Sequence, residues 1–147
     1  MKFGIYRNLN AFDPENLNYV YKAVSNIKNE LPEDIPLIGF SGSPWTLAAY
    51  SIEGRSSKHF KKTLNFINAN ADDSHTLLNT LTDACFLYLR EQVKAGADVI
   101  QIFDSWANIL DENRLNEFSM QYINKLTNAL KNDKVTSETP VIICPCK

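Results

Sequence analysis

The apolar residues of this chain follow two patterns, one typical of buried strands and one typical of helices. Short continuous apolar runs occur over residues 35–40, 97–103 and 140–144. Their length and their flanking proline and glycine residues predict buried strands rather than helices. Between these runs, apolar residues recur every three or four positions, which predicts amphipathic helices. The expected order is therefore helix, strand, helices, strand, helix, strand.

Several residues mark where the helices begin and end. Asp13 and Pro14 predict a helix start, because an aspartate caps the first free amides and a proline needs no amide donor there. This helix ends before Pro32, and its apolar positions predict one buried face: Leu17, Val20, Tyr21, Val24, Ile27 and Leu31. Further helices are expected from Pro44, over residues 58–68, from Asp72 or Asp73 to Gly96, and from Asp111 to Leu130.

Strands that alternate with long helices call for parallel pairing with crossover connections. The carboxyl ends of such strands meet at one edge, and this mouth is where ligands bind in α/β sheets and barrels. Three strands leave both sheet edges open and the last strand uncovered. The expected fold is therefore an α/β slice of a larger protein, with residues 1–147 forming a single partial domain.

Composition and charge exclude several classes of function. The 147 residues are 44% apolar and 22% charged, as in a globular domain, and the net charge of -2 comes without a basic stripe for nucleic acid. The apolar runs are too short to span a membrane, and the first residues do not resemble a signal peptide. Three unevenly placed cysteines indicate a reducing compartment, so a cytoplasmic protein is expected.

Candidate binding residues follow the first predicted strand. Hydroxyl groups at Ser41, Ser43 and Tyr50 can hydrogen-bond carboxylates, and the amides at the start of the next helix favour an anion. The alternative is structural, with Ser43 capping that helix and Trp45 in the core.

Other polar residues are weaker candidates. Asp104 and Ser105 end the second strand, where the aspartate either holds a ligand or is paired within the fold. His59 and His75 lie in helical segments with polar neighbours, so solvent exposure is expected for both. Cys144 and Cys146 follow the third strand, but such a pair supplies at most two of the four usual zinc ligands, and no metal site is predicted.

Two long motifs add a resemblance to a known family. The run IPLIGFSGSPWTLAAYSIEG and the later run AGADVIQIFDSW resemble the central part of the bacterial uroporphyrinogen decarboxylases. The family reads PLIGF-(S/A)-G-(S/A)-PWTL, then a tyrosine and a short E-G segment, and later a strand ending in F-(D/E)-(S/T). The resemblance extends, more loosely, over residues 12–143.

This resemblance implies a (β/α)8 TIM barrel that acts as a homodimer in haem biosynthesis. Its substrate would be uroporphyrinogen III, whose four acetate side chains are decarboxylated to give coproporphyrinogen III. The family uses neither metal nor organic cofactor. By motif, Tyr50 and Ser105 match residues that bind the substrate's carboxylates, and Phe40 matches an aromatic residue that packs on the macrocycle.

The family's catalytic segments have no counterpart in this chain. Its RQAGRYLPEY segment, the aspartate of its FSDIL strand and the histidine of its NLGHG motif are all missing. No catalytic residue is therefore assigned, and the isolated chain is expected to be inactive.

Two alternatives stay open. A sister branch of the same superfamily contains zinc-dependent corrinoid methyltransferases, whose metal ligands follow the strand corresponding to residues 141–144. The chain could also be a non-catalytic remnant that associates with another polypeptide.

Overall fold

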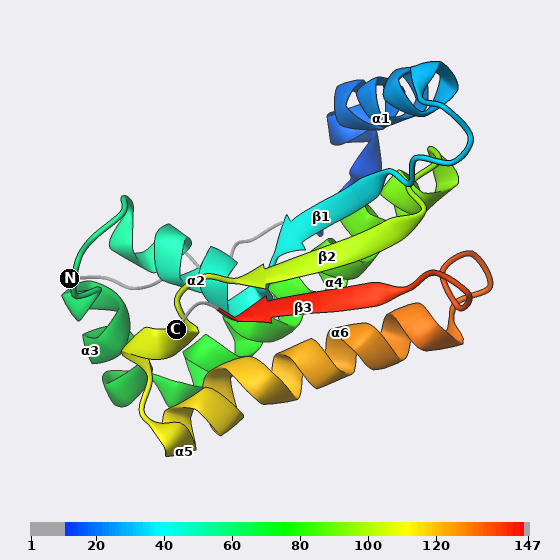
Figure 1. Cartoon of the computed structure of the whole chain (residues 1–147). Coiled ribbons are helices and arrows are strands. Elements are labelled where there is room, and N and C mark those ends of the chain that lie inside the picture. The colour runs from blue at the N-terminus through cyan, green and yellow to red at the C-terminus, as the bar shows by residue number, and fades with distance from the viewer. Residues whose placement is uncertain (1–10, 146–147) are drawn as a thin grey trace.

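A computed structural model describes residues 11–145, which form one three-stranded parallel sheet with helices between its strands (Figure 1). The strands are β1 (Ile38–Gly42), β2 (Val99–Asp104) and β3 (Val141–Pro145), and they lie side by side in the order β1-β2-β3. The α/β class with three consecutive parallel strands is thus confirmed. Each strand starts and ends slightly later than its apolar run, because backbone pairing continues into small polar residues that apolarity does not mark.

The helices account for most of the remaining chain. Before β1 lie a 3-10 turn η2 (Pro14–Leu17) and α1 (Asn18–Glu30), and between β1 and β2 lie α2 (Pro44–Glu53), α3 (Lys61–Ala69) and α4 (Ala71–Lys94). Between β2 and β3 the chain forms η3 (Ala107–Ile109), α5 (Glu112–Arg114), a π-helical segment η4 (Leu115–Met120) and α6 (Gln121–Asn132). Within residues 11–145, no helix is both long and apolar enough to cross a membrane.

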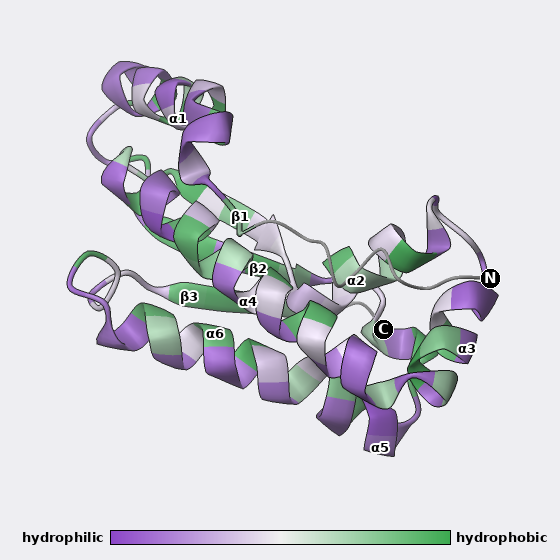
Figure 2. Cartoon of the chain, turned by 180° about the vertical axis from the view of Figure 1, so that it is seen from behind, coloured by the Kyte–Doolittle hydropathy of each residue, from purple (hydrophilic) through white to green (hydrophobic). Residues whose placement is uncertain are grey.

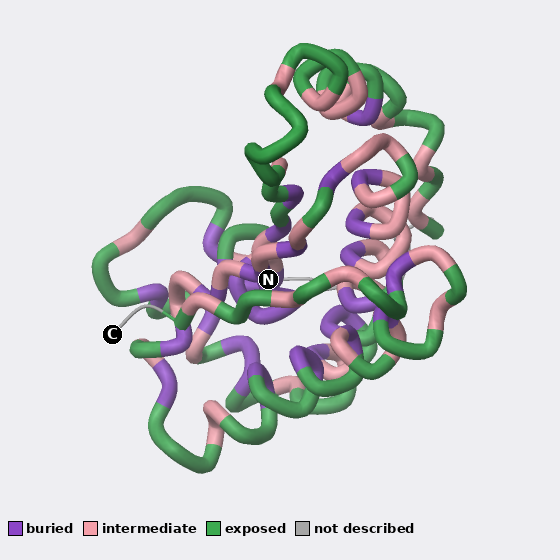
Figure 3. Tube along the Cα trace, turned by 45° about the vertical axis from the view of Figure 1, so that its right-hand side comes forward, coloured by how far each residue is buried: buried purple, intermediate pink, exposed green. Residues whose placement is uncertain are grey.

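Helices α4 and α6 pack on one face of the sheet. Figure 2 views the molecule from behind and shows α4 across the strands with α6 beside it. The apolar side chains buried between these layers are Cys85, Leu89, Ile100, Ile102, Leu126 and Leu130. They recur every four residues in α4 and α6 and every second residue in β2, so the buried tube segments in Figure 3 gather on the inward sides of the helices.

The opposite face of the sheet remains open in the described part of the chain. Ile38, Phe40 and Ile142 belong to this face and are 46%, 59% and 45% exposed. The pairing of Phe40 with Gln101, and of Gln101 with Ile142, places these side chains in a row across the three strands. In a closed barrel this face would point inward.

The predicted buried face of the first helix is wrong. In α1 only Tyr21 is buried, against the ring of Tyr88 at 6.0 Å, while Ile27 is 50% exposed. Figure 1 shows why, because α1 stands beyond the amino end of β1 and away from the sheet. Apolar periodicity identifies which face of a helix is apolar, but it does not show what covers that face.

The last predicted helix forms, but it is not α-helical throughout. Asp111 caps its first turn by accepting a bond from the Arg114 amide at 3.0 Å, as expected. The next residues form the π-helical segment η4, whose wider turn buries both Phe118 and Ser119. The helical conformation continues into α6, so the change is one of helix type over residues 115–120.

The long helix α4 is confirmed, with one corrected boundary. Asn70, not Asp72 or Asp73, occupies the cap position, and both aspartates lie in the first turn. At the other end Gly96 has a φ of 112°, and a Cβ there would lie 2.9 Å from Cγ of Lys28. Only glycine suits this backbone and this close approach.

Candidate functional site

The turn from β1 into α2 forms one side of the mouth of the sheet. The Ser43 hydroxyl accepts a hydrogen bond from the Thr46 amide at 3.0 Å and so caps α2, with Pro44 in its first turn. Trp45 is completely buried, and its indole N–H donates to the carbonyl of Trp106 at 2.9 Å. The structural interpretation of Ser43 and Trp45 is therefore confirmed.

Asp104, the last residue of β2, holds three segments together. Its side chain is 1% exposed and accepts hydrogen bonds from Ser43 at 2.6 Å, Thr46 at 3.4 Å and Ser119 at 2.5 Å. Of the two roles considered for Asp104, the structure supports pairing within the fold. The bonds from Ser43 and Ser119 are short, and such hydrogen bonds offset much of the cost of burying the Asp104 side chain.

These hydrogen bonds fix the relative positions of the segments that form the mouth. Ser43 belongs to the turn before α2, Asp104 ends β2, and Ser119 comes from η4, so one carboxylate links three elements. The amide of Ser43 also donates to the carbonyl of Phe103 at 2.8 Å. Ser119 was not identified from the sequence, although it lies four residues after Leu115 and four before Ile123, within the apolar face of this segment. A polar residue within an apolar face is the signal that could have identified it.

Tyr50 lies on a platform of aromatic rings at this mouth. Its ring meets Phe60 and Trp106 edge-on, with centroid distances of 6.1 and 5.9 Å, and those two rings lie 4.4 Å apart. Tyr50 is 41% exposed, and no residue within 11–145 hydrogen-bonds its hydroxyl group. The platform therefore holds a phenol whose hydroxyl can bind a ligand.

Glu53 supports that platform, and its role was missed in the sequence. It is 8% exposed and accepts three hydrogen bonds at 3.1 to 3.2 Å: from the Lys62 amide, the Thr63 amide and the Thr63 hydroxyl. It thereby caps α3, whose own cap residue Phe60 has a φ of 43° and makes no side-chain capping bond. A glutamate in the last turn of a helix opposes the helix dipole, and this is the signal that could have identified it.

Ser105 and Phe40 reach the mouth from two strands. Ser105 directly follows β2, is half-buried and precedes Trp106 of the aromatic platform. Phe40 lies on the open face, two residues before the carboxyl end of β1, with its ring edge-on to Phe103 at 5.9 Å. The structure thus brings Tyr50 and Ser105 to the same edge of the sheet, with Phe40 on the face that leads up to it.

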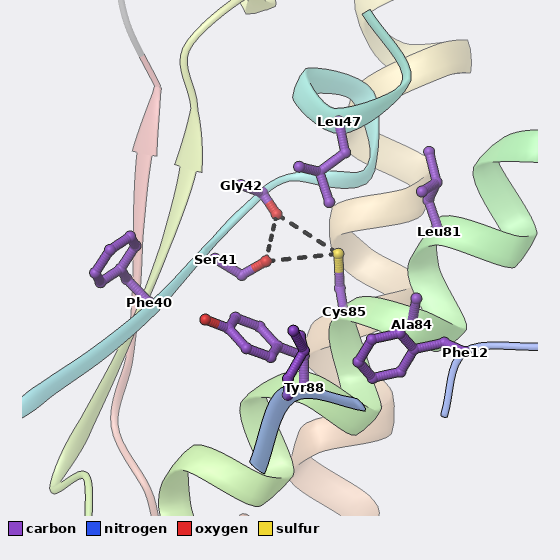
Figure 4. Close-up of a pocket in the computed structure, with 10 residues that line it drawn as sticks. Phe12, Phe40, Ser41, Gly42, Leu47, Leu81, Ala84, Cys85 and Tyr88 are labelled. Atoms are coloured by element: carbon purple, nitrogen blue, oxygen red, sulfur yellow. Dashed lines mark hydrogen bonds between the residues drawn. The ribbon is translucent and has the colours of Figure 1, made fainter. Parts of the chain in front are cut away.

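A separate cavity of about 410 Å³ lies behind β1, on the side of α4. Figure 4 shows Ser41 and Cys85 on this side, with Phe40 pointing away from it. The Ser41 hydroxyl donates to the carbonyl of Gly42 at 2.9 Å and lies 3.7 Å from the Cys85 sulfur. Ser41 therefore does not point into the mouth, and its predicted role in carboxylate binding is not supported.

Cys85 is not a nucleophile in this environment. Burial raises the pKa of its thiol to about 11, against a smaller opposing effect of the Ser41 hydrogen bond. The thiol also donates to the Gly42 carbonyl at 3.6 Å. The cavity is otherwise mostly apolar, with Leu47 and Leu81 on its wall.

The two histidines differ. His59 is exposed, as expected, although it precedes α3 rather than lying in it. The expectation for His75 is wrong: it is only partly exposed, lies 2.7 Å from the Tyr122 hydroxyl and stacks on Phe118 at 5.2 Å. Phe118 belongs to η4 and Tyr122 to the first turn of α6, so the imidazole packs where these two elements meet.

The predicted cysteine pair lies partly outside the described residues, because Cys146 falls beyond them, while Cys144 is a half-buried free thiol. Within residues 11–145, no three His, Cys, Asp or Glu side chains are grouped so that they could hold a metal ion.

The family model and the sequence relatives agree on one family. The family model described as "Uroporphyrinogen decarboxylase (URO-D)" matches residues 4–147. Proteins named uroporphyrinogen decarboxylase are 45% identical over 130 residues in Legionella pneumophila (strain Paris) and 46% identical over 129 residues in Flavobacterium johnsoniae. Each alignment covers 88% of this chain but 36% of the relative, so the chain spans about a third of the length of these proteins.

A solved structure supports the fold independently. A methyltransferase from Methanosarcina mazei superposes with a TM-score of 0.73 over 90% of this chain and 36% of its own chain, at 21% sequence identity. Identity this low supports the arrangement of strands and helices and nothing about the reaction.

Proposed function

We propose, from the premise that this chain belongs to the uroporphyrinogen decarboxylase family, that the protein it represents decarboxylates the acetate side chains of uroporphyrinogen to give coproporphyrinogen. The observation that carries this proposal is the presence of both family motifs at the mouth, one ending β1 and the other ending β2. The chain supplies one wall of the substrate site.

The three candidate residues, Tyr50, Ser105 and Phe40, would bind different parts of such a substrate. The hydroxyl groups of Tyr50 and Ser105 can donate hydrogen bonds to side-chain carboxylates, while the exposed ring of Phe40 can pack on the macrocycle. Loss of carbon dioxide requires protonation of the pyrrole ring and stabilisation of the cation formed. We assign neither step to this chain, because the family's catalytic segments are absent from its 147 residues.

Incubation of the chain with uroporphyrinogen without oxygen tests this assignment. Weak binding is expected, observed as NMR shift changes at the mouth, and no coproporphyrinogen should form. Tyr50→Phe and Ser105→Ala should each weaken binding several-fold, whereas Tyr19→Phe and Ser137→Ala, at exposed positions elsewhere, should not. Formation of coproporphyrinogen would contradict the expected inactivity, and equal binding by all four variants would contradict the assigned contacts.

Two features of the full-length protein follow from the same premise. We propose that it forms a homodimer and works in the cytoplasm, in agreement with three unevenly spaced cysteines. Size-exclusion chromatography of this chain, alone and mixed with a full-length relative, would test the alternative of a remnant that associates with another polypeptide. Co-elution together with inactivity would favour that alternative.

A further inference from the structure

Gln92 of α4 is bound to the backbone of β1 through its side chain. The amide of Phe40 donates to Oε1 of Gln92 at 3.1 Å, and Nε2 of Gln92 donates to the carbonyl of Phe40 at 3.0 Å. Gln92 is 3% exposed, and 52 residues separate it from Phe40. Its amide group therefore meets both hydrogen-bonding groups of one strand residue.

These bonds lie on the outer edge of β1. The odd-numbered residues of this segment pair toward β2, as in the bonds from Asp98 to the Leu37 carbonyl and from Ser43 to the Phe103 carbonyl, both 2.8 Å. The N–H and C=O groups of Phe40 therefore point away from β2, where a neighbouring strand would normally bind them. Within residues 11–145 no strand pairs with this edge, as expected, but at Phe40 the side chain of Gln92 binds both groups.

The surrounding residues leave room for this contact. A Cβ at Gly39 would lie 2.9 Å from Cβ of Ala97 and 3.0 Å from Oε1 of Gln92, so a larger residue at position 39 would displace the glutamine amide. Gly39 and Ala97 are both buried. The absence of a side chain at Gly39 and the small side chain of Ala97 thus make space for the Gln92 amide beside β1.

We propose that Gln92 is a positioning residue, which fixes the backbone of β1 at Phe40. By holding the backbone, it directs the Phe40 ring onto the open face of the sheet. This role in ligand binding rests on the proposed function, because only there is Phe40 a substrate contact. The backbone role stands on the geometry alone.

Hydrogen exchange measured by NMR tests the backbone role in the chain itself. In Gln92→Met, which keeps the side-chain length but forms no such bonds, protection of the Phe40 amide should fall roughly tenfold, the equivalent of one to two net hydrogen bonds. Protection at Ile100 and Ile102 should remain. Gln121→Met, at an exposed position of α6, is the matched control. Equal protection of Phe40 in Gln92→Met and the wild type would overturn the proposal.

A second variant adds a pH profile that loss of packing alone would not produce. In Gln92→Glu, a protonated carboxyl group can accept from the Phe40 amide and donate to its carbonyl, whereas a carboxylate would repel that carbonyl. The folded state therefore raises the pKa of this group, and protection should be high at acid pH and lost as the pH rises through that value. If Gln92→Met fails to fold, this profile decides, and a flat one would overturn the proposal.

Uroporphyrinogen binding separates this inference from the proposed function. If the wild type binds, Gln92→Met should bind several-fold more weakly while Gln121→Met does not, and unchanged binding would overturn the role of Gln92 in presenting Phe40. If the wild type does not bind, the proposed substrate contacts fail, and the exchange data still decide the backbone role.

Discussion

On the face of the sheet that packs on α4 and α6, the apolar side chains of the central strand are completely buried, whereas the opposite face carries exposed apolar side chains. Ile100 and Ile102 are completely buried on the first face, and Phe40 and Ile142 are 59% and 45% exposed on the second. All four residues come from strands with the same apolar character. The difference shows that the covered face stabilises the fold, while the open face is available to substrate or to further parts of a barrel.

The largest effect is expected on the covered face. Leu126→Ala removes a completely buried side chain from between α6 and the sheet and should lower the free energy of unfolding by about 2 to 5 kcal/mol. Urea denaturation would measure the loss. Leu126→Met, which keeps the volume, should cost less than about 1.5 kcal/mol. A loss below about 1 kcal/mol for the alanine variant would mean that this face does not carry the stability.

The second effect concerns the hydrogen bonds of Asp104 at the mouth. Asp104→Ala leaves the hydroxyls of Ser43, Thr46 and Ser119 without their shared acceptor and should cost about 1 to 3 kcal/mol. Thermal and urea unfolding would both report it. Asp83→Ala, at an exposed position of α4, is the control and should change stability by less than about 0.5 kcal/mol. Equal stability of the two variants would show that Asp104 does not hold these segments together.

A smaller effect is expected at the amino ends of the strands, far from the mouth. The Leu37 amide and Lys28 both hydrogen-bond Asp98, at 2.8 and 2.6 Å, and these bonds lower the pKa of its carboxyl group. The carboxylate therefore adds stability above its unfolded pKa, and this contribution is lost as the pH falls through the folded value. Asp98→Asn should be slightly less stable than the wild type at neutral pH and equal to it in acid. A constant difference at every pH would exclude this charge as the cause.

The smallest effect is expected on the open face. Ile142→Thr should change the free energy of unfolding by less than about 0.5 kcal/mol, because nothing in the described part of the chain covers this side chain. Light scattering should show less self-association, since the apolar row becomes shorter. Ile102→Thr, on the covered face, is the matched comparison and should be strongly destabilising. A cost above about 2 kcal/mol for Ile142→Thr would mean that this face is covered in solution.

The sequence was sufficient for features that depend on neighbouring residues. Apolar runs identified three strands, and the turn chemistry of Ser43 and Pro44 placed the start of α2 correctly. Strand order then located the mouth. These are local signals, and each can be read within a few residues.

Features that depend on distant residues could not be predicted in this way. Gln92 bonds a residue 52 positions away, and Ser119 in the π-helical segment η4 donates to Asp104, which lies 15 positions before it. The aromatic platform of Tyr50 likewise depends on a left-handed Phe60, which no propensity favours. In each case the deciding contact joins segments whose relative position is set by packing.

The spatial order of the strands has a consequence for synthesis of the chain. Since β1, β2 and β3 lie side by side in the order in which they are made, β1 and α4 are already present when β2 is complete. Ile100 and Ile102 are buried completely only after Leu126 and Leu130 of α6 have been synthesised. At roughly 5 to 20 residues per second, the segment from Ile102 to Leu130 takes on the order of one to five seconds to synthesise. During that interval the face that later becomes the core is the one most exposed to aggregation or to a chaperone.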